Sequence, residues 1–265
     1  MAPRKADDIR QVQTVVGPLW VDRWDQSVVK ALTRRAEYEP EWTAWLNRVI
    51  RPGMRVVDVG ANLGYYTVLF GHRVGERGRV LAFEPDPFNR DLLERSVRDN
   101  GLEDRVIVEG AAVTDRVGTC RLHLDQDHRG LHSLSPRNRL SDRAGDDIAV
   151  PAVTLDAALE RAGFEAPDFV KIDAQGAEGV ILKGAERTLG SAQPMTVMLE
   201  LWPFGLENCG SSTGEVLGRL QSHGFLGARV KKDRVDPVPC SWDEMTKRAG
   251  ELTGDHSSIN LVFTR

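Results

Sequence analysis

The segment Arg55 to Gly71, RVVDVGANLGYYTVLFG, constrains the fold more than any other part of the chain. Its valines around Asp58 predict a buried β-strand, and Gly60 and Gly64 then bracket a tight turn into an apolar helix. Glycine adopts backbone conformations that a Cβ forbids and lets a ligand approach the main chain. The amides of Ala61 to Tyr65 are predicted to lack partners at the start of the helix, so that a carboxylate or phosphate could bind there.

Two acids near this loop indicate the kind of ligand. Asp58 places a carboxylate at the end of the strand, where it would attract an ammonium group and repel a pyrophosphate. Glu84 closes the strand-like run RVLAFE twenty residues after Gly64, where related folds hold ribose hydroxyls. An amine, a carboxylate and a ribose together match S-adenosylmethionine (SAM) better than NAD. The glycine spacing also fits a nicotinamide-dependent dehydrogenase, although the third glycine of that fingerprint is missing.

Length and charge limit the class of protein. The 265 residues suffice for one sizeable domain with a small extension. With 35 basic and 39 acidic residues, the net charge of −4 gives no footprint for nucleic acid. No apolar run approaches the roughly 20 residues of a membrane span, and the first 13 residues lack the apolar core of a signal peptide. We therefore expect a soluble cytoplasmic protein without nucleic-acid or membrane partners. Widely spaced cysteines predict neither a disulfide framework nor a zinc site: Cys120, Cys209 and Cys240.

Strand-like and helix-like segments alternate along most of the chain. This alternation predicts an α/β fold with a doubly wound, mostly parallel, Rossmann-like sheet. Residues 1–50 are expected to form an N-terminal cap, with a hairpin around Gly17 and Pro18, and residues 51–265 the main domain. The segment from Asp104 to Val113 is expected to be the third strand of the sheet.

A polar insertion follows that strand. Thr119 to Ser135 begins with an alternating pattern typical of an exposed antiparallel strand, and a turn-rich run then continues to Asp147, so we expect a mobile flap. Its histidines are spaced too irregularly for a metal site. His123 and His128 are expected at the surface, whereas His132, beside Ser133, is a candidate for ligand contact.

Four acids end predicted strands: Asp58, Glu84, Asp173 and Glu200. In open parallel sheets the ligand crevice lies beyond the C-terminal ends of the strands, so these carboxylates are expected to gather at one site. Each of them could instead be a helix cap or part of a structural ion pair. Lys171 lies two residues before Asp173, on the same face of its strand, and could pair with that acid.

These motifs resemble those of the FkbM-type SAM-dependent methyltransferases. The resemblance covers residues 38–202 and rests on YEP, DVGANLGYYT, AFEPDP followed by Asn100, DFVKIDAQGAEGVILKGAERTL and Glu200. It implies a class I methyltransferase fold of seven strands with the last one antiparallel. It also implies SAM as methyl donor and O-methylation of a hydroxyl on a sugar, a polyketide or another secondary metabolite.

The resemblance also assigns residues to the cofactor. Glu39 and Asp173 would lie near the methionine end or the reacting centre, and Glu84 with Pro85 would hold the ribose. The chain departs from the family at Gln175, where Glu is more common, so that a role for that acid is lost or passes to Glu178. The loop around the cofactor would comprise Asp58, Gly60, Ala61, Asn62 and Gly64.

An aliphatic hydroxyl is a poor nucleophile while it is protonated, so a carboxylate, an imidazole or a metal should assist the transfer. Asp173 is our first candidate for the base, Glu200 the second and His132 the third. Asp173 and Glu200 could instead hold a divalent ion, but two acids do not make a ligand set, and the metal stays open. A NAD(P)-dependent oxidoreductase and a non-catalytic SAM-binding protein are the alternatives.

The acceptor itself is not encoded in any motif. Aromatic side chains could form an apolar or sugar-stacking wall, although core packing is the commoner use of such residues. A small-molecule acceptor is expected, and a homodimer stays open. The candidates for the wall are Trp20, Trp24, Trp202 and Phe204.

Overall fold

The computed structural model describes residues 8–26, 28–125, 127–139, 144–164, 166–229, 237–252 and 257–265. Its centre is a sheet of eight strands in the order β12-β11-β13-β10-β9-β3-β4-β5. The last strand, β13 (Ile259–Thr264), runs antiparallel between β10 and β11 (Leu226–Arg229). Five strands are mutually parallel: β3 (Arg55–Val59), β4 (Arg79–Phe83), β5 (Val106–Glu109), β9 (Phe169–Ile172) and β10 (Thr196–Leu201).

The predicted fold class is therefore confirmed. The seven strands implied by the family resemblance are present, with the last one antiparallel. A two-residue strand, β12 (Val238–Pro239), extends one edge.

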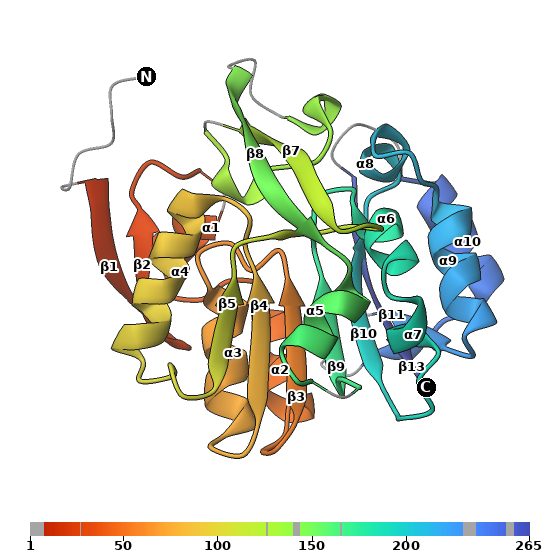
Figure 1. Cartoon of the computed structure of the whole chain (residues 1–265), viewed down its shortest axis with the longest axis horizontal. Helices are drawn as coiled ribbons and strands as arrows, with labels where there is room; N and C mark the ends of the chain where they lie inside the picture. The colour runs from red at the N-terminus through yellow and green to blue at the C-terminus, as the bar shows by residue number, and fades with distance from the viewer. Residues whose placement is uncertain are drawn as a thin grey trace.

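Helices cover both faces of this sheet, with α3 behind it and α5 in front of it in Figure 1. Adjacent residues of a strand point to opposite faces, so Val56 joins one core and Val57 the other. The first face carries α2 (Pro40–Val49), α3 (Tyr65–Val74) and α4 (Pro87–Asp99). The second carries α5 (Leu155–Arg161), α6 (Glu178–Lys183), α7 (Glu186–Leu189), α9 (Thr213–Ser222) and α10 (Trp242–Gly250).

The N-terminal hairpin lies against α4 (Figure 1). β1 (Ile9–Thr14) pairs with β2 (Gly17–Asp22), and α1 (Val28–Arg35) follows. The turn is at Val15 and Val16, whereas the sequence analysis centred it on Gly17 and Pro18. Both of these begin β2, an edge strand in which a proline without an N–H is tolerated.

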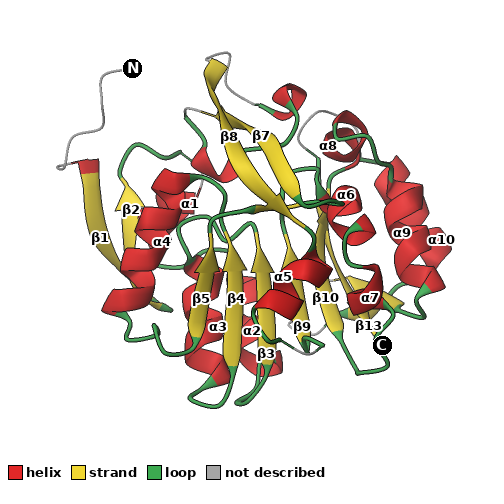
Figure 2. Cartoon of the chain, in the orientation of Figure 1, coloured by secondary structure: helices red, strands yellow, loops and turns green. Residues whose placement is uncertain are grey.

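The segment from Asp104 to Val113, which was expected to be the third strand of the sheet, is divided between two sheets. β5 ends at Glu109, and β6 (Ala112–Val113) joins a second sheet of order β6-β8-β7. There β7 (Gly118–Asp125) and β8 (Ala144–Val153) form an antiparallel hairpin, which stands over the C-terminal ends of the central strands (Figure 2). This hairpin is the predicted flap; residues 140–143 of it lie outside the described residues. Its mobility stays a prediction.

Two features of the second half were not predicted. The helical segment after Asp173 is divided into α6 and α7 at Gly184, where an added Cβ would lie 2.1 Å from the carbonyl oxygen of Thr114. A further short helix, α8 (Pro203–Asn208), follows β10. Ser241 caps α10, since its hydroxyl accepts the amide of Glu244.

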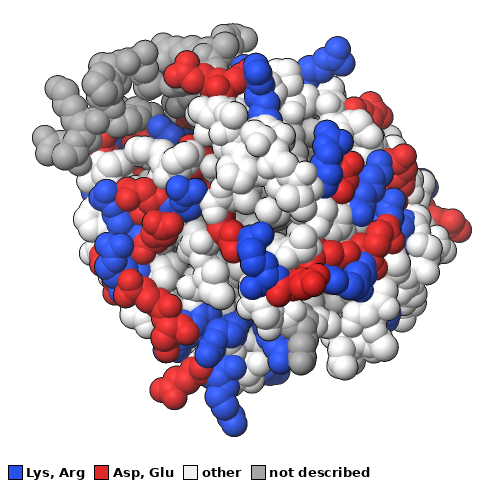
Figure 3. Space-filling view, viewed as in Figure 1, with Lys and Arg blue, Asp and Glu red and all other residues white. Residues whose placement is uncertain are grey.

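Basic and acidic side chains are interspersed on the face shown in Figure 3, in keeping with the nearly balanced composition. In the described part of the chain, every helix is too short or too polar to cross a membrane.

Candidate active site

Two adjoining cavities lie at the C-terminal ends of the central strands. The larger, about 250 Å³, lies at the ends of β3, β9 and β10, and the smaller, about 70 Å³, at the ends of β4 and β5. The flap contributes to both cavities through η2 (Arg129–Leu131). Five residues line both of them: Gly60, Asn62, Gly130, Asp173 and Gln175.

The glycine loop between β3 and α3 forms the wall between the cavities. Gly60 has a φ of 76°, and a Cβ there would lie 1.9 Å from the carbonyl oxygen of Asp173. The amides of Gly60 and Ala61 donate to Phe83, and that of Gly64 donates to Ala61. Most of the amides expected to be free are therefore bonded within the protein.

Two amides of this loop, those of Leu63 and Tyr65, have no acceptor among the described residues. They lie at the start of α3, where the helix dipole favours an anion. Of the amides from Ala61 to Tyr65 that were predicted to be free to bind an anion, these two remain as candidate donors.

Glu84 is fixed in the smaller cavity by main-chain donors. Its two carboxylate oxygens accept the amides of Asn62 at 2.8 Å and Asp86 at 2.9 Å, and its exposed fraction is 5%. Burial, followed by the negative charge of Asp86, raises the pKa of Glu84 to about 8, although both amides act in the opposite direction. Glu84 and Pro85 line the cavity at the place predicted for a ribose.

Asp58 lies behind the cavities rather than in them. It is completely buried, lines neither cavity and accepts a hydrogen bond of 2.7 Å from the hydroxyl of Thr67. Its other oxygen lies 3.3 Å from Nζ of Lys171, its cross-strand neighbour in β9. The predicted direct contact of Asp58 with a ligand ammonium does not fit this placement, because the carboxylate is already paired under the loop.

Lys171 connects this buried acid to the larger cavity. Its Nζ lies 3.7 Å from Asp173 and donates to the carbonyl oxygen of Gly60 at 3.4 Å, and its side chain is 3% exposed. Burial acts to lower the pKa of Lys171, but the charges of Asp58 and Asp173 outweigh it and raise the pKa. Lys171 pairs with Asp173, as the sequence suggested, and also with Asp58.

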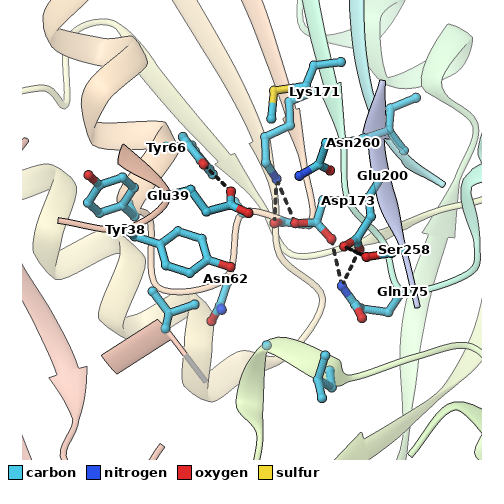
Figure 4. A pocket seen from close by; sticks show the side chains of 18 of the residues that line it. Tyr38, Glu39, Asn62, Tyr66, Lys171, Asp173, Gln175, Glu200, Ser258 and Asn260 are labelled. Atoms are coloured by element: carbon cyan, nitrogen blue, oxygen red, sulfur yellow. Dashed lines mark hydrogen bonds and ion pairs between the residues drawn. The ribbon is translucent and has the colours of Figure 1, made fainter. Parts of the chain in front are cut away.

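Two of the strand-end acids, Asp173 and Glu200, meet in the larger cavity (Figure 4). Nε2 of Gln175 donates to Asp173 at 2.7 Å and to Glu200 at 3.2 Å. The hydroxyl of Ser258 donates to the other oxygen of Glu200 at 2.8 Å. Burial, and next the charge of Asp173, raises the pKa of Glu200 well above its usual range. The first two candidates for the base are therefore neighbours.

A third carboxylate comes from the start of α2. Glu39 precedes this helix with a φ of 43° and lines the larger cavity beside Tyr38. The hydroxyl of Tyr66 donates to Glu39 at 2.5 Å. Burial raises the pKa of Glu39 despite this hydrogen bond. Glu39 thus lines the same cavity as Asp173 and Glu200, and its place near the methionine end of the cofactor stays a prediction.

The third candidate for the base, His132, does not reach these acids. It lines only the smaller cavity, where its Nδ1 accepts the amide of Asp125 at 3.0 Å and its Nε2 lies 3.4 Å from Asp86. Since the lone pair of Nδ1 is already used, a role of His132 as base does not fit this geometry. Burial would raise the pKa of Asp86, but His132 and Arg129 lower it.

The placement of the other histidines is partly corrected. His123, expected at the surface, is 8% exposed and lies 2.8 Å from Asp147, its partner across β7 and β8. His128 is partly exposed beside Asp125.

The role of the missing family acid does not pass to Glu178. This side chain is completely buried and lines neither cavity, and its Oε1 accepts the amides of Ala174 and Gly176 at 2.9 and 3.3 Å. Burial raises its pKa to about 7. Glu178 therefore closes the turn that carries Gln175 into the cavity.

The sequence model of a family described as Methyltransferase FkbM domain matches residues 58–226, which is more than half of the chain. This chain belongs to the FkbM methyltransferase family. The resemblance stated from the motifs is thereby confirmed, and membership supports SAM as the methyl donor.

Three curated relatives are similar to this FkbM-family protein. Methyltransferase sdnD from Sordaria araneosa is 26% identical, over 73% of this chain and 80% of the relative. The 31-O-demethyl-FK506 methyltransferase FkbM from Streptomyces tacrolimicus is 27% identical, over 66% and 74%. The 2-O-methyltransferase NoeI from Sinorhizobium fredii (strain NBRC 101917 / NGR234) is 27% identical, over 52% and 60%.

The site of this FkbM-family protein includes residues that the sequence analysis missed. Ser258 and Asn260 come from the chain end, and the sheet register pairs Asn260 with Glu200. Ser258 and Asn260 stand at alternate positions around the start of the last strand, and this spacing was the sequence signal that could have identified them. Among the proposed aromatic wall residues, Trp202 lines the cavity and packs on Phe204, whereas Trp20 and Trp24 bind Asp99 and Asp8 instead.

A metal site receives no support from the described residues, in which no three His, Cys, Asp or Glu side chains are placed to hold an ion.

Proposed function

We propose that this FkbM-family protein transfers a methyl group from SAM to a hydroxyl of a sugar or another secondary metabolite. The observation that carries the proposal is the larger cavity, where Glu39, Asp173 and Glu200 face a space whose described cation, Lys171, is already paired. An acid-rich cavity favours a positively charged ligand. The bound cofactor would supply the methyl group on a positively charged sulfur.

The residues of the two cavities fit such a cofactor. Glu84 would accept the ribose hydroxyls in the smaller cavity, which Pro85 also lines, and the amides of Leu63 and Tyr65 would hold a carboxylate. Asn62 separates these parts, and its side-chain oxygen is buried without a hydrogen-bond donor in the described structure, so a ligand amine or hydroxyl could satisfy it.

The rest of the larger cavity would hold the acceptor. Ser258 and Asn260 offer polar groups at one side, and Trp202 and Tyr38 offer aromatic surface. This combination suits a ring that carries hydroxyl groups. A carboxylate acceptor is less favourable, because the cations described in the two linings, Lys171 and Arg129, are both paired with acids.

Asp173 would take the hydroxyl proton. Its carboxylate lines both cavities and has a side-chain exposure of 35%, so that it can reach an acceptor beside the cofactor site. Lys171 and Gln175 hold it in place from two sides. A positioned base of this kind contributes about 100- to 10,000-fold to the rate.

Two relatives support oxygen as the receiving atom, since their names describe 31-O and 2-O methylation. Family membership sets aside the oxidoreductase alternative, and the experiment below separates an enzyme from a non-catalytic binder.

The proposal can be tested by incubating native extract with the protein and methyl-labelled SAM, followed by mass spectrometry. We expect label in a hydroxylated small molecule with wild-type protein and not with Asp173→Asn. Asp104→Asn is the matched control, because Asp104 is an exposed acid paired with Arg105 and should leave labelling unchanged. Label on nitrogen, carbon or a carboxyl group would contradict the proposed acceptor.

A further inference from the structure

We propose that Asp173 and Glu200 act as one acid pair that is bridged by Gln175. The pair holds a shared proton in the cofactor-free protein and releases it when the positively charged cofactor binds. The inference rests on the proposed function and deepens it. It assigns a positioning role to Gln175, the residue at which this chain departs from the family pattern.

The contacts of Gln175 define the pair. One amide nitrogen lies 2.7 Å from an oxygen of Asp173 and 3.2 Å from an oxygen of Glu200. Two carboxylates this close to one donor repel each other when both are ionised, so one proton is retained between them. The neutral amide donates to both acids, whereas a carboxylate at residue 175 would add a third negative charge.

The flap holds the bridge in place. Gln175 has a φ of 52°, and its carbonyl oxygen accepts hydrogen bonds from the hydroxyl of Ser133 at 2.8 Å and from Nδ2 of Asn138 at 2.9 Å. Ser133 and Asn138 are each 1% exposed. Because the main chain of Gln175 is fixed by buried donors, its side chain is directed at the two acids.

The pair shares its neighbouring cation with a further acid, Asp58. Lys171 from β9 lies between Asp173 and Asp58 and is engaged by both. Glu39 and Tyr38 face the pair from the start of α2, and Tyr66 from α3 donates to Glu39. Glu178 of α6 is a further acid near the pair, since its charge also acts on Glu200. Tyr38, Glu39 and Glu178 are negative or neutral groups, so they add no positive charge.

Burial, and next the charge of Asp173, raises the pKa of Glu200, in keeping with a retained proton. A positive charge bound in this cavity would oppose both effects and favour the ionised pair.

The proton balance closes over one cycle. The pair would lose the shared proton to solvent when the cofactor binds and would then be ionised. Asp173 would take the hydroxyl proton in the transfer, in which the methyl carbon–sulfur bond would break and the carbon–oxygen bond would form. The pair would thus regain its proton, and release of the uncharged thioether product would return the protein to its starting state.

Calorimetry can measure this release without an acceptor. SAM and S-adenosylhomocysteine (SAH) are titrated into the whole protein in buffers of different ionisation enthalpy, across the neutral pH range. Both ligands carry the same ribose and amino-acid groups, so any proton from Glu84 is released with either one. We expect SAM to release up to one proton more than SAH, since SAH lacks the positive sulfur.

Three variants assign the proton. Glu200→Gln should bind SAM and abolish the difference between SAM and SAH, whereas Glu39→Gln, which changes the neighbouring acid, should keep it. Gln175→Met removes a donor that favours the ionised acids, so the difference should persist to higher pH.

Each outcome has a distinct meaning. Failure of the wild-type protein to bind SAM would contradict the proposed function itself. SAM binding with the same proton release as SAH, or a difference that survives in Glu200→Gln, would overturn the acid pair while the function stands. An unchanged pH range in Gln175→Met would remove Gln175 from the positioning role.

Discussion

Glu84 and Glu200 both follow or end a parallel strand, and burial is the main cause of the raised pKa of each. They differ in what holds them. Glu84 accepts hydrogen bonds from two main-chain amides, those of Asn62 and Asp86, whereas Glu200 accepts hydrogen bonds from two side chains, those of Gln175 and Ser258.

The difference shows how the site divides its work. Main-chain donors survive most substitutions, so the proposed ribose side of the site is fixed by the fold. Side-chain donors change with each substitution, so the proton affinity on the methyl-transfer side can be adjusted. The predictions below test this division, beginning with the largest effect.

Lys171→Met should have the largest effect, on stability. It leaves the carboxylates of Asp58 and Asp173 without their shared cation, and breaking a buried pair in this way costs about 3–5 kcal/mol. Denaturant unfolding measures the loss. The matched control is Lys183→Met, in which a partly exposed pair with Glu215 is removed and a change of about 1 kcal/mol or less is expected. Equal losses in the two variants would show that Lys171 is not a buried charge partner.

Asp173→Asn should lower turnover by at least about 100-fold, or about 2.7 kcal/mol in activation free energy, because it removes the base. The variant keeps the shape of the side chain, so its melting temperature and its affinity for SAH should stay close to those of the wild type. Turnover is followed by transfer of labelled methyl to the identified acceptor. A variant as active as wild type would exclude Asp173 as the base.

Glu84→Gln should weaken SAM and SAH equally, by about 1.5 kcal/mol or roughly tenfold, because it alters an acceptor in the proposed ribose site. Glu200→Gln, in contrast, should weaken SAM more than SAH. Calorimetry measures the affinity of each of the two variants for SAM and for SAH. If Glu84→Gln weakened SAM more than SAH, the ribose side and the methyl-transfer side of the site would not differ as proposed.

Glu84 also predicts a pH dependence of stability. Its folded pKa of about 8 lies above the unfolded value of about 4.3, so the folded state binds the proton more tightly. Its contribution to stability is therefore greatest below about pH 4.3 and is lost as the pH rises toward 8. Denaturant unfolding over this pH range should show a smaller decline in Glu84→Gln than in wild type.

Ser258→Ala should have the smallest effect, a loss of about 1 kcal/mol in the free energy of unfolding. The hydroxyl of Ser258 lowers the pKa of Glu200, so its removal should raise that pKa further. The extra proton release of SAM over SAH should then persist to higher pH, while the affinity of SAH stays unchanged. If the pH range does not move, Ser258 contributes nothing to the ionisation of Glu200.

The two sides of the site also differ in how far the sequence predicts them. The strand, turn and helix from Arg55 onward and the position of Glu84 follow from local patterns, and the structure has them where expected. The partner of Asp58 could not be read in this way, because Lys171 becomes its neighbour only through the register of β3 and β9.

Other differences have the same origin. The division of the expected third strand between two sheets depends on where β6 finds a partner, which is β8. The bridge formed by Gln175 depends on donors in the flap, Ser133 and Asn138, that no nearby motif announces. Local patterns therefore predicted the elements and the acids at their ends, and tertiary contacts decided which acids meet.

The close approach of Gly60 to the carbonyl oxygen of Asp173 couples two parts of the protein that could otherwise vary separately. Any larger residue at position 60 would displace the main chain of Asp173, so the loop proposed to receive the donor and the group proposed to accept the proton are constrained to change together. A wider range of acceptors is then most readily obtained by substitutions in the flap and around Ser258, where side chains can be exchanged without moving this junction.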